Sequence, residues 1–118
     1  MSSVRFKGSI YIGVRDLAAA IAWYKEKLDL RESRKPMDDE IGDVALVSDH
    51  GDAFIAFGAP NAANVETRIF SVGNTQKARE WLAARGVKVG PLQVDRQGTP
   101  YFEMRDLEDN MIEFSEEP

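Results

Sequence analysis

Glu113 is the side chain that the sequence singles out for chemistry, because it is the one carboxylate among the aromatic, small polar and apolar side chains expected on one face of the sheet. A carboxylate that is partly buried by apolar neighbours has a raised pKa, and it can then act as a general base or anchor a cation. Tyr11 is a candidate acid–base partner. The alternative is a structural role, in which Glu113 pairs with Arg68 or Arg105 nearby in the sheet. The sequence leaves the two roles open.

Other reactive side chains are scarce. The chain has no cysteine, which excludes disulfides, a thiolate nucleophile and a cysteine-ligated metal. The only histidine, His50, lies in the turn sequence 49–52, which predicts a solvated residue at the end of a sheet rather than a ligand on its face. The acidic run at residues 38–40 lacks the alternation of an EF-hand, and it therefore predicts a solvated loop.

The stretch from Ser9 to Leu30 predicts a strand, a tight turn and a helix. Apolar residues at positions 10, 12 and 14 alternate with small or polar ones, the pattern of a half-buried strand. Asp16 takes the N-cap position, where its carboxylate can accept a backbone N–H of the first helical turn. Apolar residues then recur at spacings of three and four and form the stripe Leu17, Ala20, Ile21, Tyr24 and Leu28.

Short apolar runs between turn residues predict the remaining strands. In the first half these strands lie at residues 30–36, 44–48 and 53–57. In the second half they lie at residues 67–72, 87–89, 99–105 and 111–115. A second helix is expected after residue 72, capped by Asn74 or Thr75. It ends at Gly86, whose freedom at positive φ suits the position after a helix.

The two halves of the chain repeat one another. A shift of 58 residues carries Ser9 to Thr67, and a shift of 57 carries Phe57 to Phe114. Repeats of this kind need a partner to bury an apolar sheet face. We therefore predict an α+β fold of two tandem βαβββ modules whose curved mixed sheets form a cleft. The modules are expected at residues 7–58 and 66–116, joined by a linker at 59–65, within one domain, 1–118.

Strand parity predicts which side chains face the cleft. The set expected under the helices is Ile10, Ile12, Val14, Phe70, Val72, Ile112 and Phe114. The set expected to line the cleft is Ser9, Tyr11, Phe54, Ala56, Thr67, Ile69, Ser71, Met111 and Glu113. A few polar groups among apolar walls are typical of a small-molecule pocket, although the same side chains could instead fill a second core. On strand 99–105 either Tyr101 and Glu103 or the alternating pair Phe102 and Met104 faces the cleft.

Composition excludes several classes of protein. Hydrophobic residues make up 43% of the chain, which is enough for a core and too much for disorder. The net charge of −5 argues against a nucleic-acid partner and is compatible with a cationic ligand, although solubility alone also explains it. No apolar run approaches the ~20 residues that a membrane span needs. Because the N-terminal residues also lack a signal-peptide pattern, we expect a cytoplasmic protein without a membrane partner.

Two segments resemble those of a known family. Val14-Arg15-Asp16-Leu17 with Trp23-Tyr24 is similar to a V-x-D-L turn and aromatic helix, and the run 105–113 is similar to a D-P-D-G-N-x-I-E closing hairpin. These two patterns are typical of the vicinal oxygen chelate superfamily of glyoxalases, bleomycin-resistance proteins and extradiol dioxygenases, which the chain therefore resembles. The resemblance spans residues 7–116. Leu107 and Asp109 replace the usual Pro and Gly, which allows that turn a different shape.

The resemblance also implies where a metal would bind. Enzymes of this family hold a divalent metal with His, Glu or Gln side chains, which by position correspond to Ser9, Ala56, Thr67 and Glu113. Only Glu113 is a competent ligand, because alanine has no donor atom and hydroxyls bind Zn, Ni or Fe poorly. The resemblance therefore supports the fold, whereas this departure disfavours a divalent metal cofactor.

Three functions follow as hypotheses. The preferred one is a metal-independent binding protein, similar to bleomycin-resistance proteins, that sequesters a cationic or aromatic small-molecule ligand in the cleft. The resemblance implies that it is a homodimer. The alternative is an enzyme, either a glyoxalase-like lyase or isomerase or a dioxygenase with an atypical metal site at Glu113, or a metal-free acid–base enzyme that uses Glu113 and Tyr11. The third is a non-catalytic dimeric domain with a filled cleft.

Overall fold

The first strand and helix form where the sequence predicts them. In the computed structural model, which describes residues 4–32, 45–48, 52–58 and 68–117, β1 spans Phe6–Gly13 and α1 spans Leu17–Lys27. The Asp16 carboxylate accepts a hydrogen bond of 3.0 Å from the Ala19 N–H and caps the helix as predicted.

The predicted apolar stripe of α1 is wrong at its first position. Ala20, Tyr24 and Leu28 are buried, whereas Leu17 is 38% exposed. A helical side chain leans toward the helix N-terminus, so the side chain at the first position extends beyond the packed part of the helix. The buried face of α1 therefore begins one turn later than the sequence pattern indicates.

The second half repeats the strand, cap and helix. β5 spans Ile69–Val72 and α2 spans Thr75–Ala84. Of the two predicted caps, Asn74 is the one observed, since its side-chain oxygen accepts a hydrogen bond of 2.9 Å from the Lys77 N–H. Gly86 follows the helix with a φ of 86°, the left-handed conformation predicted for it.

The bounds of the remaining predicted strands differ from the predicted ones by one residue at an end where the structure describes them, and residues 33–36 of the strand predicted at 30–36 lie outside the described residues. The remaining strands are β2 (Arg31–Glu32), β3 (Ala45–Val47), β4 (Ala53–Gly58), β6 (Lys88–Val89), β7 (Gln93–Val94), β8 (Pro100–Arg105) and β9 (Met111–Glu116). The sequence did not predict β7. It is two exposed residues long and forms because β8 offers an edge to pair with. The predicted linker 59–65, His50 and the acidic run 38–40 lie outside the described residues, so the module boundaries stay a prediction.

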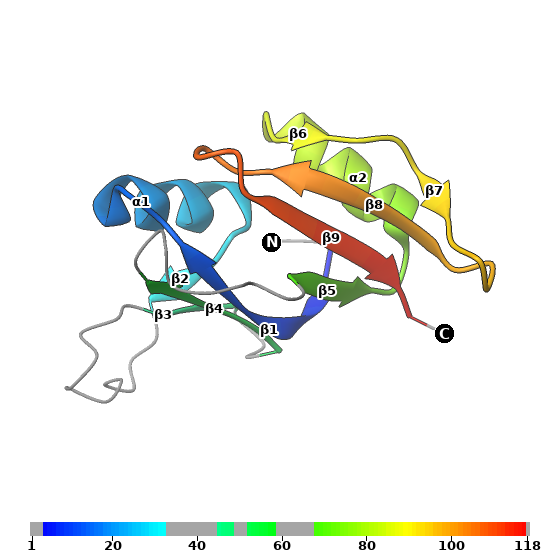
Figure 1. Cartoon of the computed structure of the whole chain (residues 1–118), viewed down its shortest axis with the longest axis horizontal. Helices are drawn as coiled ribbons and strands as arrows, with labels where there is room; N and C mark the ends of the chain where they lie inside the picture. The colour runs from blue at the N-terminus through cyan, green and yellow to red at the C-terminus, as the bar shows by residue number, and fades with distance from the viewer. Residues whose placement is uncertain (1–3, 33–44, 49–51, 59–67, 118) are drawn as a thin grey trace.

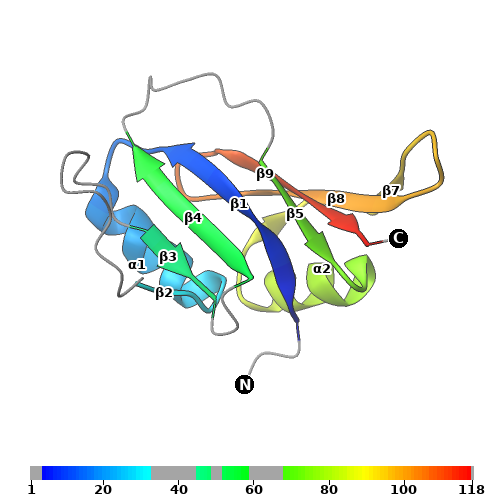
Figure 2. The ribbon, with the colours of Figure 1, turned by 90° about the horizontal axis from the view of Figure 1, so that it is seen from below.

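The strands form one curved mixed sheet (Figures 1 and 2). Its order is β2-β3-β4-β1-β5-β9-β8-β6, and β7 also pairs with β8. β1 joins the two halves, because it pairs in parallel with β4 and antiparallel with β5. α1 packs beside the β2–β4 end and α2 beside β6, β8 and β9. Neither helix of the described part is long and apolar enough to cross a membrane.

The core lies between the helices and one face of this sheet. All seven side chains predicted under the helices are buried: Ile10, Ile12, Val14, Phe70, Val72, Ile112 and Phe114. They belong to one cluster that includes side chains of both helices. The rings of Phe102 and Phe114 stack at its centre, with centroids 5.1 Å apart. One continuous core therefore spans both halves of the chain.

The C-terminal ends of the two helices are joined by reciprocal hydrogen bonds. Lys27 Nζ donates to the Arg85 carbonyl at 2.7 Å, and Arg85 Nε donates to the Lys27 carbonyl at 2.9 Å. The Arg85 guanidinium also donates to the Glu26 carbonyl and lies over the Trp81 ring, 4.6 Å from its centroid. Each helix thus provides the cation that satisfies the last carbonyls of the other.

The turn between β8 and β9 joins the halves at the opposite end. The buried Asp106 carboxylate accepts the Tyr24 hydroxyl at 2.7 Å and the backbone N–H groups of Glu108 and Asn110, both at 2.8 Å. Burial, and then the Asp106 charge, raises the pKa of Tyr24 well above its usual value. The phenol therefore keeps its proton and stays a hydrogen-bond donor to Asp106.

Two further side chains of this turn hold the end of β1. Glu108 accepts the backbone N–H groups of Arg15 and Asp16 at 2.8 and 2.9 Å, and these bonds lower the pKa of its carboxyl. Asn110 Nδ2 donates to the Gly13 carbonyl at 3.4 Å. Asp109 stands where the family has Gly and adopts a φ of 67°, so the turn keeps a left-handed residue at that position.

Candidate functional site

Seven of the eight residues predicted to bind a ligand lie on the sheet face that points away from α1 and α2, which we call the open face. Each alternates along its strand with a buried residue. They are Ser9, Tyr11, Phe54, Ala56, Ile69, Met111 and Glu113. The eighth, Thr67, lies outside the described residues. Their role in ligand binding stays a prediction.

The open face is framed by the two places where the halves meet. The described β1–β5 ladder pairs Phe6 with Val72 and Lys7 with Ser71. The described ladder ends at Lys7, and the other end of β1 is held by the β8–β9 turn. The side chains of β1 after Lys7 therefore lie between the ladder with β5 and the contacts of this turn.

Tyr11 forms one wall of this region because Gly58 leaves room for it. A Cβ atom added at Gly58 would lie 1.5 Å from the Tyr11 hydroxyl oxygen and 2.3 Å from its Cζ. The register pairs Tyr11 with Ala56, two residues earlier on β4. The ring therefore leans along the sheet and rests on the glycine backbone, while 37% of the residue remains exposed.

Two carboxylates face each other on the second half of the open face. Glu103 on β8 and Glu113 on β9 are directly opposite in the antiparallel register, and Ile69 flanks Glu113 on β5. Burial first, then the charges of Glu103 and Asp95, raise the pKa of Glu113. Like charges in directly opposed positions destabilise a sheet. This pair therefore makes the folded state less stable unless a cation binds between the two carboxylates.

The predicted structural partners of Glu113 are not used for that compensation. Arg68 donates to the Met111 carbonyl at 3.4 Å, and Arg105 donates to the Asp109 carbonyl at 3.2 Å. Within the described ranges neither Glu103 nor Glu113 has a hydrogen bond or ion pair to its carboxylate. The structural role considered for Glu113, an ion pair with Arg68 or Arg105, is therefore not observed.

The sequence did not determine which side chains of strand 99–105 lie on the open face, and the structure shows which do. Phe102 and Met104 are buried, so Tyr101 and Glu103 lie on the open face. The signal was present, since phenylalanine and methionine are more apolar than tyrosine and glutamate. The Tyr101 hydroxyl donates to Gln93 Oε1 at 3.2 Å, which connects the open face to β7.

The implied metal site is not matched by the donors present. The family positions that can be observed hold Ser9, Ala56 and Glu113, of which only the last is a strong ligand. In the part of the chain that the structure describes, no group of three or more His, Cys, Asp or Glu side chains could hold a metal ion. Two carboxylates alone do not close a transition-metal site.

Replacing Glu113 with glutamine is expected to stabilise the protein at neutral pH by a few tenths of a kcal/mol, because it removes one of two opposed charges. Since the folded-state pKa of Glu113 is raised, its ionised form destabilises the fold. That destabilisation is complete above the raised pKa and disappears as the pH falls toward the usual glutamate value. Thermal unfolding of both proteins across this range measures the difference.

The matched control for this experiment is Glu80→Gln, which changes an exposed carboxylate on α2. Its unfolding temperature should show no comparable pH-dependent difference from the wild type. An equal gain in Glu80→Gln, or a Glu113→Gln gain that persists in acid, would show that the opposed pair is not the cause.

Fold and site together define an α+β protein in which two helices cover one face of a curved mixed sheet and the other face is open. The family model for the Glyoxalase/Bleomycin resistance protein/Dioxygenase superfamily matches residues 8–114. The chain therefore belongs to this superfamily, as its sequence resemblance indicated. No curated protein matches the sequence significantly.

Solved structures share this architecture. A member of the glyoxalase/bleomycin resistance protein/dioxygenase superfamily from Sphaerobacter thermophilus has a TM-score of 0.74 and 20% identity, covering 94% of this chain and 96% of that one. A glyoxalase/bleomycin resistance protein from Catenulispora acidiphila has a TM-score of 0.67 and 19% identity, covering 95% and 98%. TnmS3, an antibiotic binding protein from a Streptomyces species, has a TM-score of 0.72 and 13% identity, covering 100% of both chains. At such identities the likeness establishes the fold.

Proposed function

We propose that this chain is a metal-independent small-molecule-binding protein that sequesters a cationic or aromatic ligand on the open face. The opposed pair Glu103 and Glu113 is the observation that carries the proposal. Both carboxylates lack a cationic partner in the described part of the chain, and their mutual repulsion costs stability that a bound cation would restore.

Other side chains of the open face supply the aromatic and apolar part of such a site. Tyr11, Ile69 and Tyr101 are exposed or half-buried on the same face. Aromatic faces attract cations and stack on flat ligands, while a few polar groups among apolar walls fix the orientation of a small molecule. The structural similarity to TnmS3, which is described as an antibiotic binding protein, is consistent with a binding rather than a catalytic role.

Proflavine, a cationic aromatic dye, tests the proposal against acridine, its uncharged counterpart at neutral pH. Proflavine should raise the unfolding temperature and bind in a calorimetric titration, because a ligand that binds only the folded state stabilises it. Glu113→Gln should weaken binding about tenfold, since it removes a charge-assisted contact. Glu80→Gln on the helix side is the matched control and should bind like the wild type.

The pH dependence of proflavine binding gives a second measurement. Proflavine stays cationic in acid, whereas Glu113 becomes protonated as the pH falls through its raised pKa. Affinity should therefore decrease at a higher pH than an ordinary glutamate would cause, and Glu113→Gln should lose that dependence. Equal binding of acridine, or no effect of Glu113→Gln, would contradict a cation site at this pair.

Metal independence is tested by titrating Zn²⁺ and Ni²⁺ into chelator-treated protein. We expect no stoichiometric binding, because the donors at the family positions are weak. Micromolar binding that Glu113→Ala abolishes would contradict this part of the proposal and would favour the glyoxalase-like or dioxygenase-like enzyme. The homodimer that the resemblance implies also stays a proposal, which sedimentation at several concentrations would test.

A further inference from the structure

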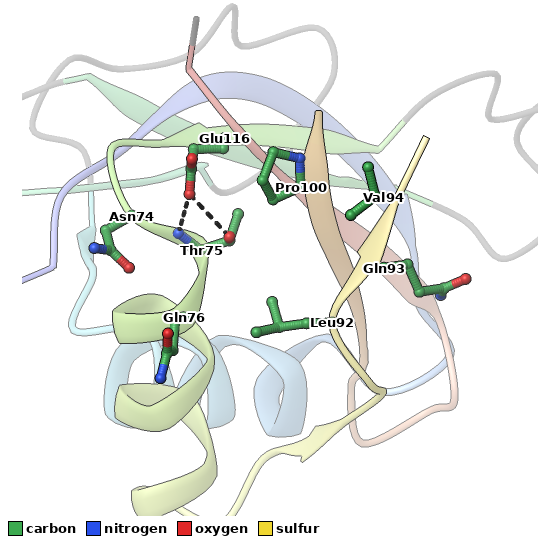
Figure 3. A pocket seen from close by; sticks show the side chains of 8 residues that line it. All are labelled: Asn74, Thr75, Gln76, Leu92, Gln93, Val94, Pro100 and Glu116. Atoms are coloured by element: carbon green, nitrogen blue, oxygen red, sulfur yellow. Dashed lines mark hydrogen bonds between the residues drawn. The ribbon is translucent and has the colours of Figure 1, made fainter. Parts of the chain in front are cut away.

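A cavity of about 340 Å³ lies on the side of the sheet opposite the open face (Figure 3). It is bounded by the N-terminal end of α2 and by the hairpin of β7 and β8. Pro100 is the first residue of β8. It lies on the same face of this strand as Phe102, which follows two residues later and is buried. Because α2 begins at Thr75, it covers Phe102 but leaves this end of the hairpin open.

Three apolar side chains form the walls of this cavity, which we call the α2 pocket. They are Leu92, Val94 and Pro100, and Figure 3 shows them around the hollow opposite Thr75. Leu92 is 43% exposed and Val94 is 66% exposed. Large apolar side chains that remain exposed and converge on a hollow mark a binding surface. The volume is at the lower end of the range of small-molecule sites.

One carboxylate is held in place at the edge of the α2 pocket. Glu116 Oε1 accepts the Thr75 N–H at 2.9 Å and the Thr75 hydroxyl at 3.0 Å (Figure 3). Thr75 is itself buried, so both bonds are sheltered from water. In the described part of the chain the second oxygen, Oε2, has no hydrogen-bond or ion-pair partner.

The negative charge of the α2 pocket favours a positively charged ligand. Its lining contains one carboxylate and no Lys, Arg or His, the other polar lining residues being neutral: Asn74, Thr75, Gln76 and Gln93. A positively charged donor at Glu116 Oε2 would form a charge-assisted hydrogen bond, which is about twice as strong as a neutral one. A carboxylate already fixed by two bonds loses little entropy when it accepts a third.

We propose that the α2 pocket is a second ligand site, which takes a small amine with an apolar body. The ammonium group binds Glu116 Oε2, and the apolar body packs on Leu92, Val94 and Pro100. The site uses none of the open-face residues, so this proposal does not depend on the function proposed above.

Phenethylamine and its uncharged analogue 2-phenylethanol are the probes, followed by amide chemical shifts of the full chain in NMR titrations. Phenethylamine should shift the amides of Thr75, Gln76 and Val94 in a saturable way, and 2-phenylethanol should bind at least about tenfold more weakly. Glu116→Gln keeps an oxygen that can accept both Thr75 bonds but removes the charge, so it should weaken phenethylamine binding by a similar factor.

Two further variants locate the site. Val94→Lys changes the most exposed wall residue and adds a repelling charge, so it should abolish the shifts without unfolding the protein. Glu113→Gln should leave them unchanged, because Glu113 lies on the other face of the sheet.

Four outcomes would overturn the second site. They are no saturable shifts of the pocket amides, pocket shifts that persist in Val94→Lys, pocket shifts that Glu113→Gln abolishes, and equal binding of the alcohol. Shifts of the pocket amides on dilution alone would instead show that a second copy of the chain covers this face, and would also overturn the proposal.

Discussion

Replacing Asp106 with alanine is expected to lower the free energy of unfolding by about 3–4 kcal/mol, because several buried donors would lose their acceptor. The Tyr24 hydroxyl, the backbone N–H groups of Glu108 and Asn110, and the Asn110 side chain all donate to this carboxylate. Asp106 is only 6% exposed, so water has little access to those donors. Urea unfolding monitored by circular dichroism measures the loss.

Asp109→Gly provides the control in the same turn. Asp109 already has a left-handed backbone, which glycine adopts more easily, so this variant should be as stable as the wild type or slightly more stable. Tyr24→Phe removes one donor and should cost about 1–2 kcal/mol. An Asp106→Ala protein within about 1 kcal/mol of the wild type would show that the turn does not join the two halves in the way described.

Replacing Gly8 with alanine is expected to cost about 2–4 kcal/mol, for two additive reasons. Gly8 has a φ of 140°, which a residue with a side chain rarely adopts. A Cβ atom there would also lie 3.0 Å from the Ile69 carbonyl oxygen and 3.1 Å from Phe70 Cδ1. The position follows the two-pair ladder between β1 and β5, so the strain falls on the junction of the halves.

Gly73→Ala is the matched control, since a Cβ atom there would meet nothing within 4 Å. It should change the free energy of unfolding by less than about 0.5 kcal/mol. Denaturant melts of the two variants and the wild type compare the effects directly. Similar stabilities for the two alanine variants would mean that β1 can relax at Gly8 without weakening the junction.

The features predicted well from the sequence are those that local physics determines. The helix caps Asp16 and Asn74 depend on a hydrogen bond three residues ahead, and both are observed. The buried face of β1 depends on alternation within one strand, and Ile10 and Ile12 are buried as expected. The repeat then supplied the arrangement of the second half without any long-range information.

The features that the sequence missed depend on partners far along the chain. The sequence does not predict the buried role of Asp106, because its phenol partner, Tyr24, lies 82 residues away. Glu108 likewise holds N–H groups 92 and 93 residues away. β7 has two exposed residues and no periodic pattern, so only the edge of β8 explains it.

The candidate site was partly predictable for the same reason. Parity placed Glu113 and Tyr11 on one face, because a strand turns alternate side chains to opposite sides. The opposed carboxylate, Glu103, depends on the register between β8 and β9, which parity within one strand does not determine. The α2 pocket depends on where a helix ends relative to a hairpin, and no sequence pattern reports that position.

The reciprocal bonds between Lys27 and Arg85 bear on how the protein unfolds. If α1 melted alone, α2 would lose the cation over its last carbonyls, and the reverse holds for α2. Partial unfolding of one half therefore removes hydrogen bonds that stabilise the other half. This loss disfavours an intermediate in which only one half is folded. We therefore expect this chain, although it is built from two similar repeats, to unfold as one cooperative unit rather than as two foldons of separate stability.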